Sequence, residues 1–379
     1  MATKSSPVVV RRIEGGRDMR RFISMPWSIY RDDPCWVPPV RLERKMHLSS
    51  SNPYFKHAAV RYWLAFRGER PVGRISAQVD RLYLERYGRN VGFWGMLEAE
   101  DDPEVFSALL DRAAGWLRAQ GMEKMQGPFN LSINQECGLL IKGFQYPPVL
   151  MMGHARPYYS SRIESLGHEK ARDLLAYLIR RSQDTVKRIE GLLGTRRDRL
   201  ATRPLDRGRL EAELDAMFSI FNDAWSENWG FVPFTRDEYL DLGKGLSRLA
   251  RPELIRMAEL DGRPAGFIAV LPDLNEIIRD LDGRLLPFGW AKLLWRIKFH
   301  RFKGARVLLM GVLRRYQDSL AGAGISLSLI RDVMAELLKL GIDRVELSWI
   351  LEDNMAMRRI IEALGAEPYK IYRIYEKGL

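Results

Sequence analysis

Residues 307–334 read VLLMGVLRRYQDSLAGAGISLSLIRDVM, and this stretch decides the fold class. Its first part, 307–313, is an apolar run of strand length. From Ile325 onward apolar residues recur at a helical spacing, at Ile325, Leu327, Leu329, Ile330, Val333 and Leu337. We therefore predict a strand, a loop and a helix, which is the repeating unit of an α/β protein.

The predicted loop is rich in cations and glycine. Arg314 and Arg315 follow the strand, and Gly322 and Gly324 precede a helix that we expect to begin at Ile325. The free N–H groups and the dipole of such a helix end attract a phosphate. A glycine-containing loop in any α/β protein gives the same pattern, so this alternative stays open.

The residues after this helix carry a family resemblance. A second strand is expected at 344–350, followed by NMAMRRIIEALGAEPYKIYRIYEK from Asn354. With this order the sequence resembles the GNAT superfamily of acyl-CoA N-acyltransferases. The resemblance implies acyl-CoA as co-substrate, held by Val312, Arg314, Arg315, Gly322, Ala323, Gly324, Ile325 and Asn354. Ser319 stands where the family has Arg or Gln, and Ile361 stands where many members place the Tyr that protonates the departing thiolate.

Length and composition limit the classes of protein to which this chain can belong. A chain of 379 residues with 46% hydrophobic content is expected to form two packed domains. Its two cysteines, Cys35 and Cys137, fit a reducing cytoplasm and are expected to be buried fillers. No signal peptide or membrane-spanning run is recognised. The net charge of +12 predicts an anionic partner, with coenzyme A, nucleic acid and acidic lipid as candidates.

An internal repeat predicts two copies of one fold. The segment AFRGERPVGRISAQVD, from Ala65, aligns without a gap with AELDGRPAGFIAVLPD, from Ala258. We therefore predict an α/β (α+β) protein of two tandem GNAT-like domains, each a mixed twisted sheet flanked by helices. The N-terminal domain is expected at 1–181 and the C-terminal, acyl-CoA-binding domain at 200–379, with a linker helix at 182–199.

The first half lacks the cationic loop. At the equivalent position Glu98, Glu100, Asp101, Asp102 and Glu104 are expected to crowd a helix start. Carboxylates cap a helix well there but repel a pyrophosphate. We therefore assign acyl-CoA to the second half and expect the first half to help shape the acceptor site.

The repeat places an insertion at 274–304 in the second half. Its part 285–304 combines aromatic residues with Lys and Arg and contains no Asp or Glu. A helix of this kind can lie in a membrane interface, so we predict peripheral contact with an acidic membrane surface, on the inner face of the cytoplasmic membrane. A helix that packs its apolar stripe on its own domain is the alternative.

An insertion in the first half, within 127–154, carries alternating polar residues. In an extended segment Asn130, Ser132, Asn134 and Glu136 would share one face. We predict catalytic roles for Glu136, as a general base with a raised pKa, and for Asn134. Residues that stabilise a turn are the alternative. The predicted substrate-binding residues are Asn130, Ser132, Tyr158, Trp225, Asn228 and Trp229.

The resemblance extends over most of the chain. The segments GPFNLSINQECGLLIKGF, from Gly127, and NWGFVPFT, from Asn228, resemble the bacterial ceramide synthase type of double-GNAT protein. That type implies transfer of a fatty acyl group from acyl-CoA to the amine of a sphingoid base, a long-chain amine lipid. No metal is expected, because the five His residues show no paired ligand spacing. Two alternatives remain: aminoacyl transfer from charged tRNA, and a non-catalytic acyl-CoA or lipid-binding protein. Nucleic acid is not expected as a partner of this chain.

Overall fold

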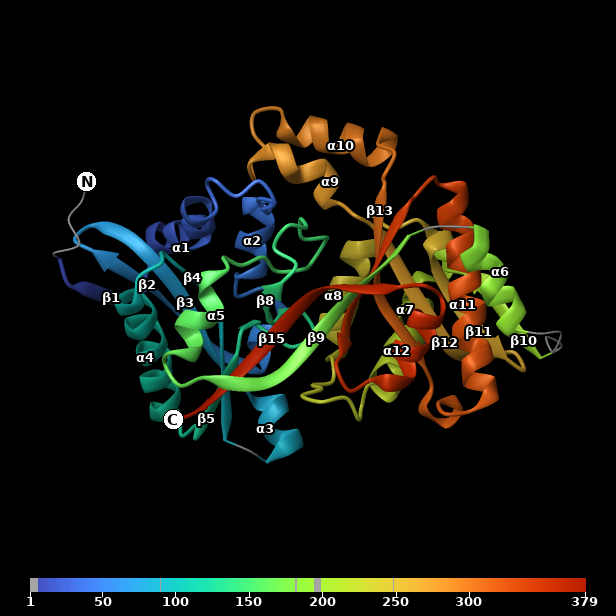
Figure 1. Cartoon of the computed structure of the whole chain (residues 1–379), viewed down its shortest axis with the longest axis horizontal. Coiled ribbons are helices and arrows are strands. Elements are labelled where there is room, and N and C mark those ends of the chain that lie inside the picture. The colour runs from blue at the N-terminus through green and yellow to red at the C-terminus, as the bar shows by residue number, and fades with distance from the viewer. Residues whose placement is uncertain (1–5, 89, 181–182, 194–198, 248) are drawn as a thin grey trace. The chain divides into compact units, whose positions relative to one another are not determined.

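The structure is a computed structural model that describes residues 6–88, 90–180, 183–193, 199–247 and 249–379. The chain forms two compact units (Figure 1). Unit 1 comprises Met1–Leu174, Ile278–Gly289 and Lys370–Leu379, and unit 2 comprises Leu175–Ile277 and Trp290–Tyr369. Two strands, β9 (Glu169–Arg180) and β15 (Glu367–Gly378), each begin in one unit and end in the other. Most of the linker predicted at 182–199 is helix α6 (Gln183–Leu193), and residues 182 and 194–198 lie outside the described part.

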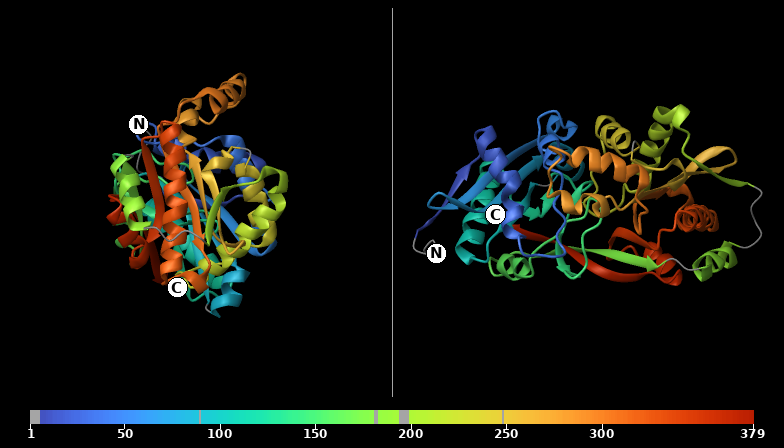
Figure 2. Two further views of the ribbon diagram at one scale, coloured as in Figure 1. Left: turned by 90° about the vertical axis from the view of Figure 1, so that its right-hand side faces the viewer. Right: turned by 90° about the horizontal axis from the view of Figure 1, so that it is seen from above.

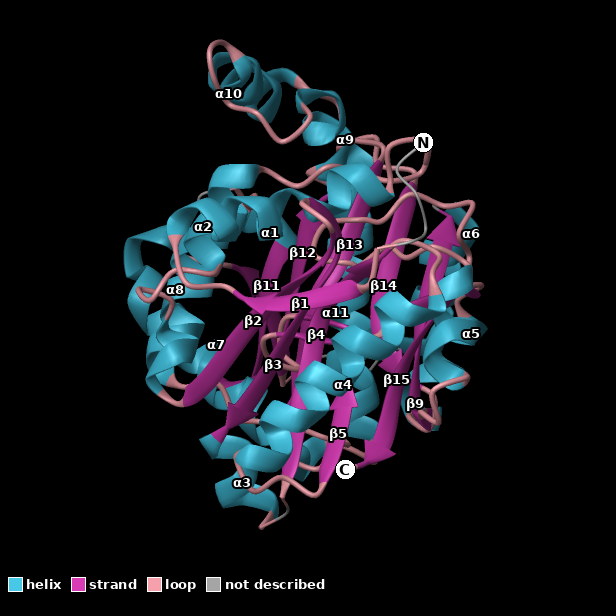
Figure 3. Ribbon diagram, turned by 90° about the vertical axis from the view of Figure 1, so that its left-hand side faces the viewer, coloured by secondary structure: helices cyan, strands magenta, loops and turns pink. Residues whose placement is uncertain are grey.

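Unit 1 is built on a mixed sheet with helices on both faces (Figure 3). Strands β1 to β4 pair antiparallel in chain order, β4 then pairs parallel with β5, and β5 pairs antiparallel with β15. A Cβ on Gly73 would contact Leu109 of α4, whereas the neighbouring Arg74 lies over Phe22 of α1, so α4 and α1 cover opposite faces. The elements are β1 (Val8–Arg12), α1 (Gly16–Ile29), α2 (Arg41–His47), η1 (Pro53–Lys56), β2 (Ala58–Arg67), β3 (Arg70–Asp80), α3 (Arg81–Tyr87), β4 (Val91–Ala99), α4 (Pro103–Ala119), β5 (Lys124–Gly127), β6 (Phe129–Asn130), β7 (Glu136–Cys137), β8 (Leu139–Lys142) and α5 (Tyr158–Glu164).

Unit 2 repeats this plan. Strands β10 to β13 pair antiparallel in chain order, and β13 then pairs parallel with β14. A Cβ on Gly266 would contact Ile325 of α11 and one on Gly311 would contact Ile220 of α7, so each helix packs closely on the sheet. The elements are β10 (Leu200–Pro204), η2 (Arg207–Arg209), α7 (Leu210–Ala224), α8 (Arg236–Ser247), η3 (Pro252–Leu254), β11 (Ile255–Leu260), β12 (Arg263–Pro272), α9 (Asn275–Ile278), α10 (Gly289–Phe299), β13 (Gly304–Val312), η5 (Arg314–Tyr316), α11 (Leu320–Lys339), β14 (Arg344–Leu351) and α12 (Met355–Ala363). The turn η4 (Arg279–Leu281), between α9 and α10, belongs to the segment Ile278–Gly289 of unit 1.

The hairpins at the aligned segments confirm the predicted repeat. Ala65 pairs with Gly73 in the β2–β3 hairpin, and Ala258 pairs with Gly266 in the β11–β12 hairpin. In both hairpins the register shifts immediately after that alanine. The shared register shows that the two halves use one local structure, and the predicted mixed α/β class is correct.

Two local predictions were wrong. Helix α11 begins at Leu320 rather than at Ile325, because Ser319 is extended and its Oγ accepts the N–H of Gly322 at 3.1 Å, which caps the helix. Gly322, Ala323 and Gly324 therefore lie in the first helical turns and not in a loop. Residues 130–136 are not one extended segment either, because a turn at 131–135 folds β6 back on β7.

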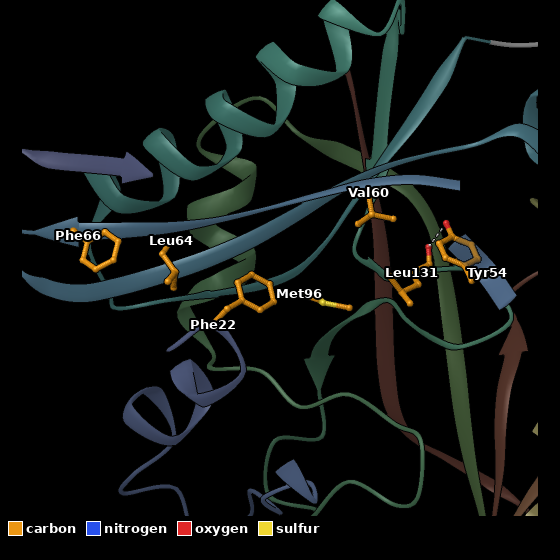
Figure 4. Close-up of a cluster of buried hydrophobic side chains, with 7 residues drawn as sticks. All are labelled: Phe22, Tyr54, Val60, Leu64, Phe66, Met96 and Leu131. Carbon is orange, nitrogen blue, oxygen red and sulfur yellow. Dashed lines mark hydrogen bonds between the residues drawn. The ribbon is translucent and has the colours of Figure 1, made fainter. Parts of the chain in front are cut away.

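The first insertion contributes to the core of unit 1. Leu131 is buried in a cluster with Phe22, Tyr54, Val60, Leu64, Phe66 and Met96 (Figure 4). The hydroxyl of Tyr54 donates to the carbonyl oxygen of Leu131 at 3.1 Å. The insertion is therefore anchored by burial of apolar side chains rather than carried as a loose surface loop.

Candidate functional site

The candidate site of unit 2 begins where two parallel strands part. Hydrogen-bonded pairing of β13 with β14 runs from Gly304 opposite Arg344 to Val307 opposite Leu347. Both strands continue beyond this point, β13 to Val312 and β14 to Leu351. Within the described residues β13 and β14 do not pair beyond Val307 and Leu347. The backbone N–H and C=O groups on their facing edges are therefore available to a ligand.

A cavity of about 790 Å³ occupies the space between the separated strands. Its volume is that of a site for a sizeable organic ligand. Helix α11 lines it with Ala323, Ser326, Ile330, Val333, Met334 and Leu337. Helix α12 lines it with Asn354, Ala356, Met357, Ile360 and Ile361. The wall is mostly apolar, so the cavity suits an aliphatic group better than a charged one.

The cavity extends to the start of α11. Gln317, Asp318, Ser319, Leu320 and Gly322 all line it, and Leu320 is 89% exposed. The first N–H groups of a helix have no intrahelical acceptor, and the helix dipole adds partial positive charge there. A ligand could therefore bind with an anionic group at this end of the cavity and an apolar group deeper inside it.

The cations predicted for this site lie beside the cavity. Neither Arg314 nor Arg315 is part of its lining. The backbone N–H of Arg314 donates to Asp223 at 2.7 Å, and its guanidinium is 3.1 Å from Glu227. The guanidinium of Arg315 lies over the ring of Tyr316. Both residues belong to the short turn η5, which leads to the start of α11.

The remaining predicted cofactor residues have different positions. Val312, Gly322, Ala323 and Asn354 line the cavity, whereas Gly324 and Ile325 do not. Ile325 is a fully buried residue of α11 that faces β12, and Asn354 caps α12 by accepting the N–H of Met357 at 3.1 Å. The sequence analysis did not predict the apolar residues of α11 and α12 as cavity residues, because in sequence they have the same pattern as ordinary core positions.

Three of the predicted substrate-binding residues lie at the same cavity. Trp225, Asn228 and Trp229 follow α7 and all line it. The indole N–H of Trp225 donates to the carbonyl oxygen of Met310 at 3.2 Å, which holds the ring against β13. This aromatic wall was predicted from the residues together with the GNAT resemblance, and the structure puts it against the separated strands.

The equivalent position in unit 1 is filled by the protein itself. Parallel pairing of β4 with β5 also stops early, at Phe93 opposite Gln126. A Cβ on Gly95 would overlap the carbonyl oxygen of Phe129, and the N–H of Met96 donates to Asn130 at 2.8 Å. The side chain of Gln78 donates to the same carbonyl of Phe129 at 2.7 Å. Strand β6 therefore occupies this position.

Glu136 of unit 1 lies in an ion-pair cluster. Its carboxylate is 3.0 Å from Arg44 of α2 and accepts the amide N–H of Asn130 at 3.1 Å. Burial acts to raise the pKa of Glu136, but Arg44, His47 and Asn130 together outweigh burial and hold this pKa below its usual range. The cluster does not give Glu136 the raised pKa that we predicted for a general base.

The other predicted polar residues of unit 1 have local partners. The Oγ of Ser132 accepts the N–H of Asn134 at 2.9 Å, as in a turn stabilised by a hydroxyl. The hydroxyl of Tyr158 donates to the carbonyl oxygen of Ala99 at 2.8 Å. Asn130, Ser132, Asn134 and Glu136 thus belong to one hairpin, while Tyr158 belongs to α5.

Glu98 was not predicted as a site residue, because it was grouped with the acids at the start of α4. It lies instead in β4, where its carboxylate accepts the hydroxyl of Tyr159 at 2.8 Å. Arg74 is 3.7 Å away. Burial raises the pKa of Glu98, and the opposing effect of Arg74 does not cancel it. A carboxyl group with a raised pKa is a candidate for proton transfer. The acids that do belong to the helix start are Asp102, which caps α4, and Glu104, and both pair with Arg67.

Among the described residues, no group of three His, Cys, Asp or Glu side chains is arranged to hold a metal ion. In the same part of the chain no helix combines the length and apolar character needed to cross a membrane.

Solved structures identify the fold. The chain matches a tandem GNAT protein from the clavulanic acid biosynthesis pathway with a TM-score of 0.56 and 13% identity, over 98% of each chain. It matches a GCN5-related N-acetyltransferase from Sphaerobacter thermophilus with a TM-score of 0.53 and 12% identity, over 98% of this chain and 95% of that one. The chain therefore has the tandem GNAT fold.

Curated relatives identify the family. The chain is 46% identical to Protein YghO of Escherichia coli (strain K12), over 98% of this chain and 95% of that protein. It is 44% identical to a bacterial ceramide synthase of Caulobacter vibrioides, over 96% of this chain and 95% of that protein. No protein-family model matches. The chain belongs to the GNAT-related family that includes these two proteins.

Proposed function

We propose that this protein is an acyl-CoA-dependent N-acyltransferase that transfers a fatty acyl group to the amine of a sphingoid base. The observation that carries the proposal is the apolar cavity between β13 and β14, which reaches the start of α11. A thioester with an aliphatic tail and a nucleotide diphosphate needs an apolar space and a helix N-terminus in continuity. The relative named as a bacterial ceramide synthase supports the choice of acceptor.

The proposed reaction is a direct transfer. The neutral amine attacks the thioester carbonyl carbon, so a C–N bond forms, the C–S bond breaks and the thiolate of coenzyme A takes up a proton. Backbone N–H groups on the edge of β13 near Val312 would stabilise the carbonyl oxygen as it gains charge. Trp225 and Trp229 would exclude water from the thioester.

The ammonium form of the amine must lose one proton before attack, and the attacking nitrogen loses a second proton as the amide forms, which balances the proton that the thiolate takes up. Within unit 1, Glu98 has a raised pKa and Tyr159 orients its carboxyl group, so we propose Glu98 as a proton acceptor that kinetics must test. We propose that Glu136 holds the β6–β7 hairpin, which also contains Asn134, in place through its ion pair with Arg44. Both assignments predict distinct kinetic behaviour.

The test of the proposed function is a product assay. Purified protein would be incubated with acyl-CoA of several chain lengths and either a sphingoid base in detergent micelles or a short water-soluble amine. Release of free thiol would be followed, and the lipid product would be identified by mass spectrometry. We expect an N-acyl sphingoid base at a rate well above the rate without enzyme. Thiol release without an amide product, or transfer of an aminoacyl group from added charged tRNA in place of the acyl group from acyl-CoA, would contradict the proposal.

A further inference from the structure

Helix α10 presents an apolar outer surface. Leu294, Trp295 and Phe299 are 60%, 62% and 57% exposed, and none of the residues of α10 is buried. The rings of Trp295 and Phe299 lie with their centroids 5.7 Å apart, so they form one continuous patch. Large apolar side chains grouped in this way on a protein surface indicate an interaction site.

The opposite side of α10 attaches the helix to unit 2. The guanidinium of Arg296 donates to the carbonyl oxygen of Ile277 at 2.8 Å. His300, just after the helix, is 3.1 Å from Glu276 of α9, and the same carboxylate accepts the N–H of Gly304 at 2.7 Å. Figure 2 shows α10 extending from α9 away from the strands of unit 2. The helix is therefore held by one side, and its outer side stays exposed.

The charge around the exposed patch has one sign. Between residues 285 and 304 the charged side chains are Lys292, Arg296, Lys298, Arg301 and Lys303, and there is no Asp or Glu. Lys298 lies over the ring of Phe299 with its ammonium 5.3 Å from the centroid. An apolar patch ringed by cations complements a surface that is anionic outside and apolar beneath, which is the surface of an acidic lipid bilayer.

We propose that the outer face of α10 docks onto an anionic lipid bilayer, with Leu294, Trp295 and Phe299 at the level of the head groups. Lys298 and Arg301 would then contact the lipid phosphates. This inference deepens the proposed function by naming the surface from which the enzyme takes its long-chain amine. Docking requires no turnover, so it can fail or succeed independently of the acyl transfer.

The test is flotation of the full-length protein with vesicles. Vesicles of phosphatidylcholine alone would be compared with vesicles that also contain phosphatidylglycerol, at low and at high salt. We expect binding to the anionic vesicles that weakens with salt. The triple variant Leu294→Ser, Trp295→Ser, Phe299→Ser and the double variant Lys298→Glu, Arg301→Glu should each bind at least about tenfold more weakly.

Matched controls remove exposed groups elsewhere. Val9→Ser removes an apolar side chain from β1, and the pair Arg20→Glu, Arg118→Glu reverses two exposed charges of unit 1; both should bind as the parent does. All variants should keep the parent rate with the short water-soluble amine, which shows that they fold. The α10 variants alone should lose rate with the sphingoid base presented in vesicles.

Three outcomes would overturn the proposal. The first is unchanged flotation of both α10 variants. The second is equal binding to neutral and anionic vesicles. The third is an α10-dependent association of the protein with itself or with tRNA, seen by analytical ultracentrifugation, without any vesicle binding.

Discussion

At the scale of single residues, Gly322 and Gly324 look equivalent in sequence but have different surroundings. A Cβ on Gly322 would overlap the carbonyl oxygen of Tyr316, which is backbone and cannot move aside without distorting η5. A Cβ on Gly324 would have its nearest neighbour, Leu200, at 4.0 Å. The close approach of α11 to the preceding turn therefore requires glycine at the first position only.

This difference predicts opposite effects of two alanine substitutions. Gly322→Ala should lower the free energy of unfolding by about 1–3 kcal/mol and raise the KM for acyl-CoA, because the start of α11 must shift. Gly324→Ala should be neutral or raise stability by up to about 1 kcal/mol, since alanine favours helix. Urea unfolding and steady-state kinetics on both variants provide the measurement. Equal effects of the two changes would argue against this account of the helix start.

The two carboxylates of unit 1 give a second prediction at this scale. Because the pKa of the proposed proton acceptor Glu98 is raised above its ordinary value, its protonation should limit kcat/KM on the acid side of the pH profile. Glu98→Gln should lower kcat by at least about 100-fold and abolish that limb of the pH profile. Glu136→Gln should change kcat by less than about tenfold. A pH profile that keeps its acid limb in Glu98→Gln would rule out Glu98 as the base.

Glu136 should affect stability instead. Its folded-state pKa is lowered, so its ion pair with Arg44 stabilises the protein above the ordinary carboxyl pKa, and this contribution is lost as the pH falls through the folded value. Glu136→Gln should therefore cost about 1–2 kcal/mol at neutral pH, a discounted figure because both side chains are partly exposed, and nothing at strongly acidic pH. Urea unfolding of parent and variant at both pH values measures the difference.

At the scale of elements, the parting of β13 from β14 creates the cavity, and α11 forms one of its walls. Ala323 lies on that wall near the start of the helix. Ala323→Trp should fill this part of the cavity and raise the KM for acyl-CoA at least about tenfold, with little change in stability because Ala323 is only half-buried. Ala119→Trp, at the exposed end of α4, is the matched control and should leave KM unchanged. An unaffected KM in Ala323→Trp would place the substrate outside this cavity.

At the scale of the whole molecule, one fold occurs twice: in unit 2 a cavity lies between the parallel strands β13 and β14, whereas in unit 1 strand β6 lies at the equivalent place. Hydrogen exchange should detect this asymmetry. Saturating coenzyme A at 100 times its Kd stabilises the bound state by about 2.7 kcal/mol, and slower exchange should appear in β13, β14 and the start of α11. The amide hydrogens of β4 and β6 should exchange at the same rate with and without coenzyme A, because Phe129 and Asn130 of β6 already occupy the place where β4 and β5 stop pairing. Protection of β4 and β6 with no change in β13 would reverse the assignment of the two units.

The sequence by itself determined the class of fold, the repeat and the half that carries the cationic loop. These features depend on local periodicity and on the aligned hairpins, where Ala65 and Ala258 mark the same register. Only the tertiary structure decided that α11 begins at Leu320, that Glu136 pairs with Arg44, and that β6 fills the first copy while the second stays open. The physical reason is that a cap, a pKa and a cavity each depend on atoms brought together from distant parts of the chain, and no local pattern records those contacts.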